Sequence, residues 1–149
     1  MRNAGRGFTL VELMIGVAII GILAGIAYPS YLKQVQKSNR SDAKVVLNDV
    51  AQRLQRCFTA HGRYNPADGT CAVVDAVKAA AGIASTEGFY VVKVADAADL
   101  TATTYLLTAT PVAGGRQASD SDCARFTLNQ LGVRAAFSSS NVNNTDKCW

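Results

Sequence analysis

The sequence GFTLVE at residues 7–12 opens an apolar stretch that continues without a break to Tyr31. From Phe8 to Ala27 the only charged residue is Glu12. A helix needs about 20 apolar residues to cross the hydrocarbon layer of a bilayer. We therefore expect a membrane-spanning helix here. The short basic segment before it predicts that the N-terminus lies in the cytoplasm and the rest of the chain outside it.

Two features of this stretch differ from an ordinary secretory signal. Such a signal places small residues at a cleavage site after its apolar region, whereas here the small residue Gly7 comes before it. The second feature is Glu12, because a carboxylate at membrane depth costs about 2.5–3.5 kcal/mol and is usually paired and functional. The alternative is a plain anchor that tolerates a glutamate near the membrane surface.

The whole segment GFTLVELMIGVAIIGILAGIAYPSY, residues 7–31, resembles the class III signal and N-terminal helix of type IV pilins. The resemblance implies that residues 1–7 are a leader, which a prepilin peptidase removes by cutting between Gly7 and Phe8. It also implies N-methylation of Phe8. Residues 8–31 would then leave the bilayer and polymerise with other pilin subunits, with the help of the pilus assembly machinery in the inner membrane.

Glu12 has a physical role in such a filament. Cleavage creates a positively charged amine at Phe8, and methylation leaves it cationic. In a water-poor filament core, the amine and the Glu12 carboxylate can each supply the partner that the other lacks. A buried charge without a partner is strongly destabilising, so we expect Glu12 to set the register of assembly rather than to catalyse a reaction.

Gly21, Gly25 and Pro29 lie in the second half of the apolar stretch. The G-x-x-x-G spacing lets helices approach closely in a membrane, while glycine and proline weaken a helix. In related pilins the matching stretch can lose helical order inside the filament, so we expect residues 21–29 to be the soft segment of the helix. The alternative is that these residues are simply tolerated, which is common in membrane helices.

Length and charge predict one globular head, residues 32–149, carried on the long helix. The chain has 149 residues and a net charge of +4, which falls to +2 when Arg2 and Arg6 leave with the leader. A charge of this size does not by itself indicate nucleic-acid binding.

The first part of the head is predicted to be the second half of the helix. Apolar residues recur every three or four positions, typical of a helix with one buried stripe, and these are Ala43, Val46, Leu47, Val50, Leu54 and Phe58. Gly62 is a natural helix end. Residues 57–88 then form a connector rich in turn residues, with a short helical turn expected at Ala76–Ala81.

Four short segments of the sheet region, residues 88–137, are rich in aromatic and β-branched residues or alternate in polarity. They are predicted to be strands at 88–94, 103–110, 125–131 and 133–137. Turn residues separate them, so an antiparallel meander is expected, with one face on the helix stripe. The predicted fold class is therefore α+β, with a long N-terminal helix packed on a four-stranded antiparallel sheet, and the resemblance to pilins implies the type IV pilin fold.

The head contains four cysteines: Cys57, Cys71, Cys123 and Cys148. An even number in an exported domain indicates two disulfides, for which three pairings exist. Proximity favours Cys57–Cys71 and Cys123–Cys148, and the latter would close a C-terminal loop over residues 123–149. The rival interpretation is a metal site. It lacks support because no C-x-x-C occurs and His61 is the only histidine. We expect His61 to be a solvated loop residue.

The C-terminal sequences TYLLTATP, CARFTLNQLG and CW resemble one pilin subgroup, the PilE-like minor pilins and the ComP competence pilins. This favours a structural subunit of a type IV pilus that supports adhesion, twitching motility or natural transformation. The alternative is a ComP-like minor pilin that binds DNA during uptake. Candidate DNA contacts near the disulfide-closed end are Arg116, Arg125, Arg134 and Lys147. Ordinary surface charge is the competing explanation for these four residues.

A type II secretion pseudopilin would share the N-terminal motif. Many such subunits use a calcium loop near the C-terminus, which the paired cysteines here argue against. Asp120 and Asp122 keep that alternative open, although such a pair is more often a solvated turn. The sequence carries no arrangement of catalytic residues, so we expect no enzyme activity, no cofactor and no metal. We expect a single-pass inner-membrane precursor with a periplasmic head, which then joins an extracellular pilus.

Overall fold

The structure is a computed structural model that describes residues 9–149, and the chain divides into two compact units at Val35 and Gln36. The first described unit is the N-terminal part of helix α1 (Leu10–His61), which is assigned as helix through Pro29. By length and composition this part of α1 could cross a membrane, and none of its most apolar residues is buried. Gly7 and Phe8 lie outside the described residues.

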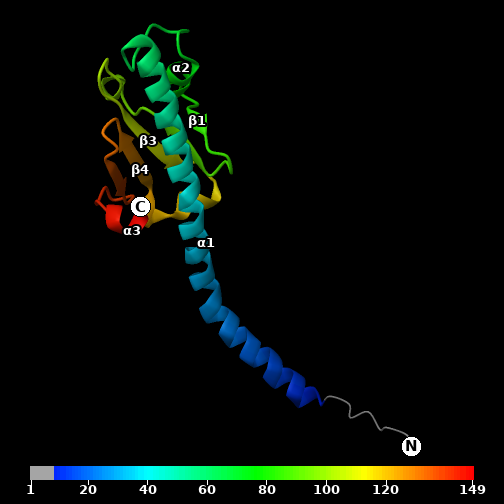
Figure 1. The fold of residues 1–149 in the computed structure, drawn as a ribbon. Coiled ribbons are helices and arrows are strands. Elements are labelled where there is room, and N and C mark those ends of the chain that lie inside the picture. Colours follow the sequence, from blue (N-terminus) through cyan, green and yellow to red (C-terminus); the bar gives the residue numbers. More distant parts are fainter. Residues whose placement is uncertain (1–8) are drawn as a thin grey trace, which may run out of the picture. The chain divides into compact units, whose positions relative to one another are not determined.

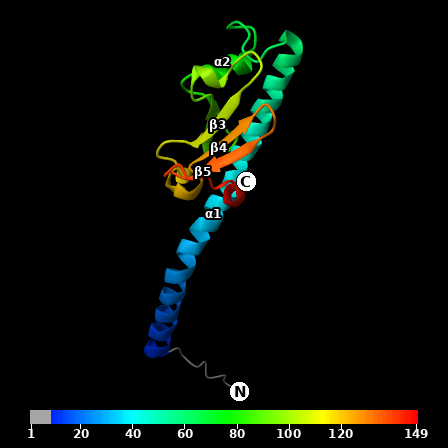
Figure 2. The same cartoon turned by 90° about the vertical axis from the view of Figure 1, so that its left-hand side faces the viewer.

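The second unit, Gln36–Trp149, contains the rest of α1 and an antiparallel sheet in the order β1-β2-β3-β4-β5 (Figures 1 and 2). The strands are β1 (Ile83–Ala84), β2 (Tyr90–Lys93), β3 (Leu106–Pro111), β4 (Arg125–Asn129) and β5 (Arg134–Phe137). Helix α2 (Ala72–Lys78) precedes the sheet and helix α3 (Thr145–Cys148) follows it. The short 3-10 turns η1 (Ala97–Asp99), η2 (Arg116–Ser119) and η3 (Ser121–Cys123) lie between strands.

The core lies between α1 and one face of the sheet. Figures 1 and 2 show this part of α1 running along the sheet. The predicted stripe on α1 is buried at Ala43, Val46, Leu47, Val50 and Leu54, with Phe58 partly buried. Side chains along a strand point alternately to the two faces of the sheet. The face toward α1 contributes to the core Tyr90, Val92, Leu107, Ala109, Phe126, Leu128 and Ala136.

The predicted fold class is confirmed, with one correction to the sheet. The four expected strands are present, but a fifth, β1, pairs Ile83 with Val92 inside the region that the sequence marks as connector. Gly82 makes this possible because its φ is +65° and a Cβ there would lie 2.6 Å from Val91 Cγ1 and 2.7 Å from the Val92 carbonyl oxygen. Only glycine fits such a conformation and such a close approach.

The connector differs from the prediction in a second way. Helix α2 begins at Ala72, directly after Cys71, rather than at Ala76. Its buried residues are Val74 and Val77, which join the core. The end of α1 is as predicted, because Gly62 has a φ of +69° and its N–H donates to the Phe58 carbonyl at 2.7 Å.

Candidate functional site

Glu12 completes the N-terminal cap of α1. The Thr9 N–H and hydroxyl donate to Glu12 Oε2 at 3.0 and 2.8 Å, and the Glu12 N–H donates to Thr9 Oγ1 at 3.3 Å. This reciprocal arrangement is a capping box, which satisfies backbone donors that a helix start leaves free. The predicted partner of Glu12, the amine of a cleaved Phe8, lies outside the described residues.

The predicted soft segment is helical in the isolated chain. A Cβ added at Gly21 or Gly25 would meet nothing within 4 Å. The surrounding side chains are exposed as well, including Ile20 at 66% and Ile26 at 74%. This apolar surface has no partner within the part of the chain that the structure describes.

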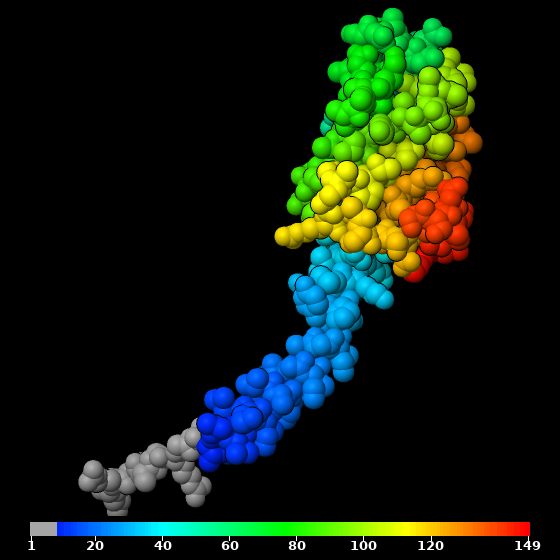
Figure 3. Space-filling model, turned by 180° about the vertical axis from the view of Figure 1, so that it is seen from behind, coloured from blue at the N-terminus to red at the C-terminus, as the bar shows by residue number. Residues whose placement is uncertain are grey.

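The two disulfides are Cys57–Cys71 and Cys123–Cys148, the pairing that sequence proximity favours. The second connects η3, just before β4, to α3. Trp149, the residue after Cys148, holds this end of the chain in place. Its Nε1 donates to the Ala135 carbonyl at 2.9 Å, and its ring lies 5.9 Å from that of Phe126. In Figure 3 the segments that follow β3, coloured yellow to red, fill most of the lower part of the head as seen from behind.

Two of the four candidate DNA contacts, Lys147 and Arg125, already bind side-chain oxygens within the head. Lys147 Nζ donates to Asp122 Oδ2 at 2.7 Å. The Arg125 guanidinium lies 4.3 Å from the centre of the Phe137 ring and donates to Asn141 Oδ1. A phosphate would have to compete with these contacts. Arg116, by contrast, is exposed in η2.

Arg134 belongs to a basic cluster that the sequence did not reveal. Its guanidinium lies 5.3 Å from the Trp149 ring centre, while Lys44 Nζ lies 6.0 Å from that centre and donates to the Trp149 carbonyl oxygen at 3.1 Å. We call Lys37, Lys44, Arg134 and Trp149 the Trp149 cluster. Lys37 and Lys44 are seven residues apart and so lie on one face of α1, a signal that can be read in the sequence once that face is known to meet Trp149.

The charge of the Trp149 cluster affects the titration of Lys44. Partial burial lowers the pKa of Lys44, and the positive charges of Arg40, Arg134 and Lys37 lower it further. All the named charges acting on Lys44 are therefore positive. Arg134 and Lys37 of the cluster therefore repel the Lys44 ammonium, whereas Arg40 is paired with Asp120.

The loop between β3 and β4 is held to α1 by buried polar contacts. Arg40 binds Asp120 through Nε to Oδ2 at 2.7 Å and Nη2 to Oδ1 at 3.0 Å, and both residues are buried. Gln117, 1% exposed, donates from Nε2 to the Gln36 carbonyl at 3.2 Å and to the Tyr90 hydroxyl at 2.9 Å. Burial is the main cause that raises the pKa of Tyr90, so its hydroxyl stays protonated.

The expectation that Asp120 and Asp122 form a solvated turn is therefore wrong for Asp120. Its carboxylate is neutralised by Arg40, and Asp122 contacts Lys147. The two carboxylates thus have separate cationic partners. This weakens the argument for a calcium loop at this position.

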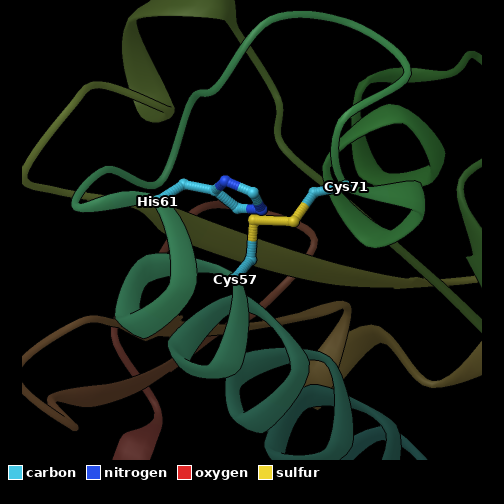
Figure 4. Close-up of side chains that lie close together, drawn as sticks. All are labelled: Cys57, His61 and Cys71. Carbon is cyan, nitrogen blue, oxygen red and sulfur yellow. A yellow bond between two sulfur atoms is a disulfide. The ribbon is translucent and has the colours of Figure 1, made fainter.

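The other disulfide lies against a histidine (Figure 4). Cys57 Sγ, Cys71 Sγ and a ring nitrogen of His61 all lie within 4.8 Å of one another. His61 is exposed, as expected, but it is the last residue of α1 rather than part of a loop. The sequence offered a signal for this contact, since Cys57 and His61 are four residues apart and lie on one helix face.

Comparison with known proteins places these features in a family. Residues 29–127 match the family described as type IV minor pilin ComP, DNA uptake sequence receptor. Residues 2–28 match the prokaryotic N-terminal methylation motif, which includes Gly7, Phe8 and Glu12.

Several curated proteins are similar over part of the chain. Fimbrial protein EcpC of Eikenella corrodens is 40% identical over 92 residues, 61% of this chain and 54% of that protein. Type IV major pilin protein PilA of Myxococcus xanthus is 48% identical over 60 residues, 40% of this chain and 27% of that protein. The chain thus spans about half or less of the length of these relatives.

Among solved structures, the non-core minor pilin PilV of Neisseria meningitidis matches with a TM-score of 0.52. The match covers 73% of this chain and 93% of PilV at 17% identity, so it supports the fold alone. The match to the ComP family, in contrast, extends over most of the chain and includes the second half of α1 and β1 to β3. The chain belongs to the ComP family of type IV minor pilins.

Proposed function

We propose that this chain is a type IV pilus subunit, cut between Gly7 and Phe8 by a prepilin peptidase, methylated at Phe8 and polymerised through residues 8–31. The observation that carries the proposal is the exposed apolar surface of α1 between Leu10 and Ile26, which needs a bilayer or other helices to cover it. A precursor anchored in the inner membrane with a periplasmic head, and then a subunit of an extracellular pilus, provides each environment in turn.

Assembly would use Glu12, with Gly21, Gly25 and Pro29 as the soft segment. In the isolated chain Glu12 caps its own helix. A neighbouring subunit's amine would offer the carboxylate a cationic partner that Thr9 does not. The partners proposed for this step are other pilin subunits and the inner-membrane assembly machinery.

Mass spectrometry of sheared, purified pili tests this proposal. The expected N-terminal peptide begins at methylated Phe8, and the abundance of the chain relative to other pilins separates a minor from a major subunit. Glu12→Val should lower incorporation at least tenfold, whereas Gln34→Val, which also removes a polar side chain from α1, should not. Pili that contain the Glu12→Val chain at the wild-type level would contradict the role of Glu12.

The second proposed function is DNA binding by the head, for which the family description is the main support. In this chain we assign the phosphate contacts to Arg134, Lys44 and Lys37 of the Trp149 cluster and to Arg116. Arg125 and Lys147 are secondary candidates, because each already binds a side-chain oxygen, of Asn141 and Asp122, that a phosphate would have to displace.

Duplex binding by the full chain in detergent micelles, measured at several salt concentrations, tests the DNA proposal. Affinity should fall steeply with salt, and each lost phosphate contact should reduce the slope of log K against log salt by about 0.9. Lys44→Gln and Arg134→Gln should each weaken binding about three- to tenfold. Arg53→Gln, an exposed cation elsewhere on α1, is the matched control. Absence of duplex binding even at low salt would overturn the proposal.

A further inference from the structure

The two disulfides of the head differ in their access to solvent. Cys123 and Cys148 are 0% and 2% exposed, so both sulfurs of that bond lie in the core. Cys57 is 4% exposed, but its partner Cys71 is only partly buried. Thiol–disulfide exchange requires an attacking thiolate to reach a sulfur along the axis of the bond. Cys71 is therefore the cysteine that an external thiol can reach most easily.

Exchange also requires that the departing sulfur be stabilised, and His61 can do this for Cys57. Attack on Cys71 Sγ expels Cys57 Sγ as a thiolate, and Cys57 belongs to the apolar core. A thiolate in apolar surroundings is costly. His61 lies one turn further along α1, with a ring nitrogen within 4.8 Å of both sulfurs, and histidine is the side chain suited to proton transfer near neutral pH.

We propose that Cys57–Cys71 is a site of thiol exchange at which a small external thiol becomes attached to Cys71, with His61 as the proton donor. The thiolate RS⁻ forms a bond to Cys71 Sγ while the bond between Cys71 Sγ and Cys57 Sγ breaks. The electron pair goes to Cys57 Sγ, which takes a proton from the His61 imidazolium. The products are a mixed disulfide at Cys71 and a neutral Cys57 thiol, so the number of disulfide bonds is unchanged.

The surrounding structure would keep the site formed after the exchange. Tyr64 holds the segment between the two cysteines in place independently of the disulfide. It is only 5% exposed, its N–H donates to the Ala102 carbonyl at 3.0 Å, and its ring centre lies 4.5 Å from that of Phe58. On the other side, Val74 and Val77 anchor α2 in the core. Breaking the disulfide therefore need not unfold the head, and Cys57 stays close enough to reverse the reaction.

The experiment uses the full chain in detergent micelles, exposed to low concentrations of glutathione, quenched with acid, alkylated and mapped by peptide mass spectrometry. The expected adduct is glutathione on Cys71, with Cys57 alkylated as a free thiol and Cys123–Cys148 intact. His61→Gln should slow adduct formation at least tenfold. Arg63→Gln is the matched control, because it removes an exposed charge near the same helix end without removing the proton donor.

Three results would overturn the proposal. They are an adduct on Cys57 rather than Cys71, equal reaction at the two disulfides, and a rate for His61→Gln equal to that of the unaltered chain. Circular dichroism of each variant shows whether it is folded. Because His61 is exposed, its replacement should leave the fold unchanged, and any loss of rate then reports the missing proton donor.

Discussion

The two halves of α1 show how one continuous helix can satisfy two different surroundings. From Leu10 to Ile26 the apolar side chains point in all directions and are exposed in the isolated chain. From Gln36 to His61 apolar residues form one stripe, which the sheet buries. The first half is apolar on every face and so depends on lipid or on other subunits, whereas the second is stabilised within its own chain. Substitutions in the second half should therefore affect the stability of the head, while those in the first should leave it unchanged and act on the helix itself, on membrane insertion or on assembly.

The largest expected effect on stability comes from the buried ion pair between Arg40, in the second half of α1, and Asp120, in the loop between β3 and β4. Asp120→Ala leaves the Arg40 guanidinium buried without its partner, so the free energy of unfolding should fall by about 3–5 kcal/mol. Urea unfolding monitored by fluorescence of Trp149, the only tryptophan, measures this change.

The matched control for that prediction is the exposed ion pair Arg53–Asp49 on the same helix, with side chains 51% and 43% exposed. Asp49→Ala should cost less than about 1 kcal/mol, because water already solvates both charges. Equal effects of Asp120→Ala and Asp49→Ala would show that burial does not control the energy of the Arg40–Asp120 pair.

A pair of leucine substitutions compares the two halves of α1 directly. Leu47 is 0% exposed and Leu23 is 61% exposed. Leu47→Ala should lower the free energy of unfolding of the head by about 2–5 kcal/mol, because it removes buried methyl groups and leaves a cavity. Leu23→Ala should change it by less than about 0.5 kcal/mol. A large effect of Leu23→Ala on urea unfolding of the head would contradict the division of α1 into two independent parts.

The sequence predicted the features that depend on neighbouring residues better than those that depend on residues far apart in the chain. The stripe on α1, its end at Gly62 and β2 to β5 are marked by local spacing and turn residues, and all were predicted. Strand β1 was missed because its two residues pair with β2 and carry no period of their own. The conformation of Gly82 that permits this pairing depends on the position of Val91 and Val92, which local sequence does not give.

The candidate site was less predictable for the same reason. Lys44 and Arg134 meet only because α1 and β5 both contact Trp149, and a search confined to the C-terminal region misses Lys44. Asp120 was interpreted as solvated because its partner Arg40 lies 80 residues earlier in the chain. The disulfides could be inferred from proximity, since each joins cysteines separated by only 14 or 25 residues.

Two glycines extend the comparison with a smaller effect. Gly82→Ala should destabilise the head by about 1–3 kcal/mol, because its positive φ is strained for alanine and the new Cβ would overlap Val91 and the Val92 carbonyl. Gly25→Ala should not destabilise the isolated chain, because a Cβ there meets nothing within 4 Å and alanine favours a helix. Urea unfolding measures the loss of stability caused by Gly82→Ala. Circular dichroism measures the helix content of the Gly25→Ala chain. A loss of pilus incorporation by Gly25→Ala, with helix content preserved, would indicate that Gly25 is needed for close contact between subunits.

The smallest predicted effect concerns the first turn of α1. Thr9→Ala removes a hydroxyl that accepts from the Glu12 N–H and donates to its carboxylate, so the first turn should lose about 1 kcal/mol of local stability. Amide hydrogen exchange in micelles should then be about fivefold faster at residues 10–13. Thr59→Ala is the control at the other end of the helix, where the hydroxyl donates to the Gln55 carbonyl and caps no free N–H.

If Glu12 leaves Thr9 for a neighbouring subunit during assembly, Thr9→Ala should alter exchange in the isolated chain but not in the filament. An equal effect in both states would mean that Glu12 keeps its capping contact after polymerisation.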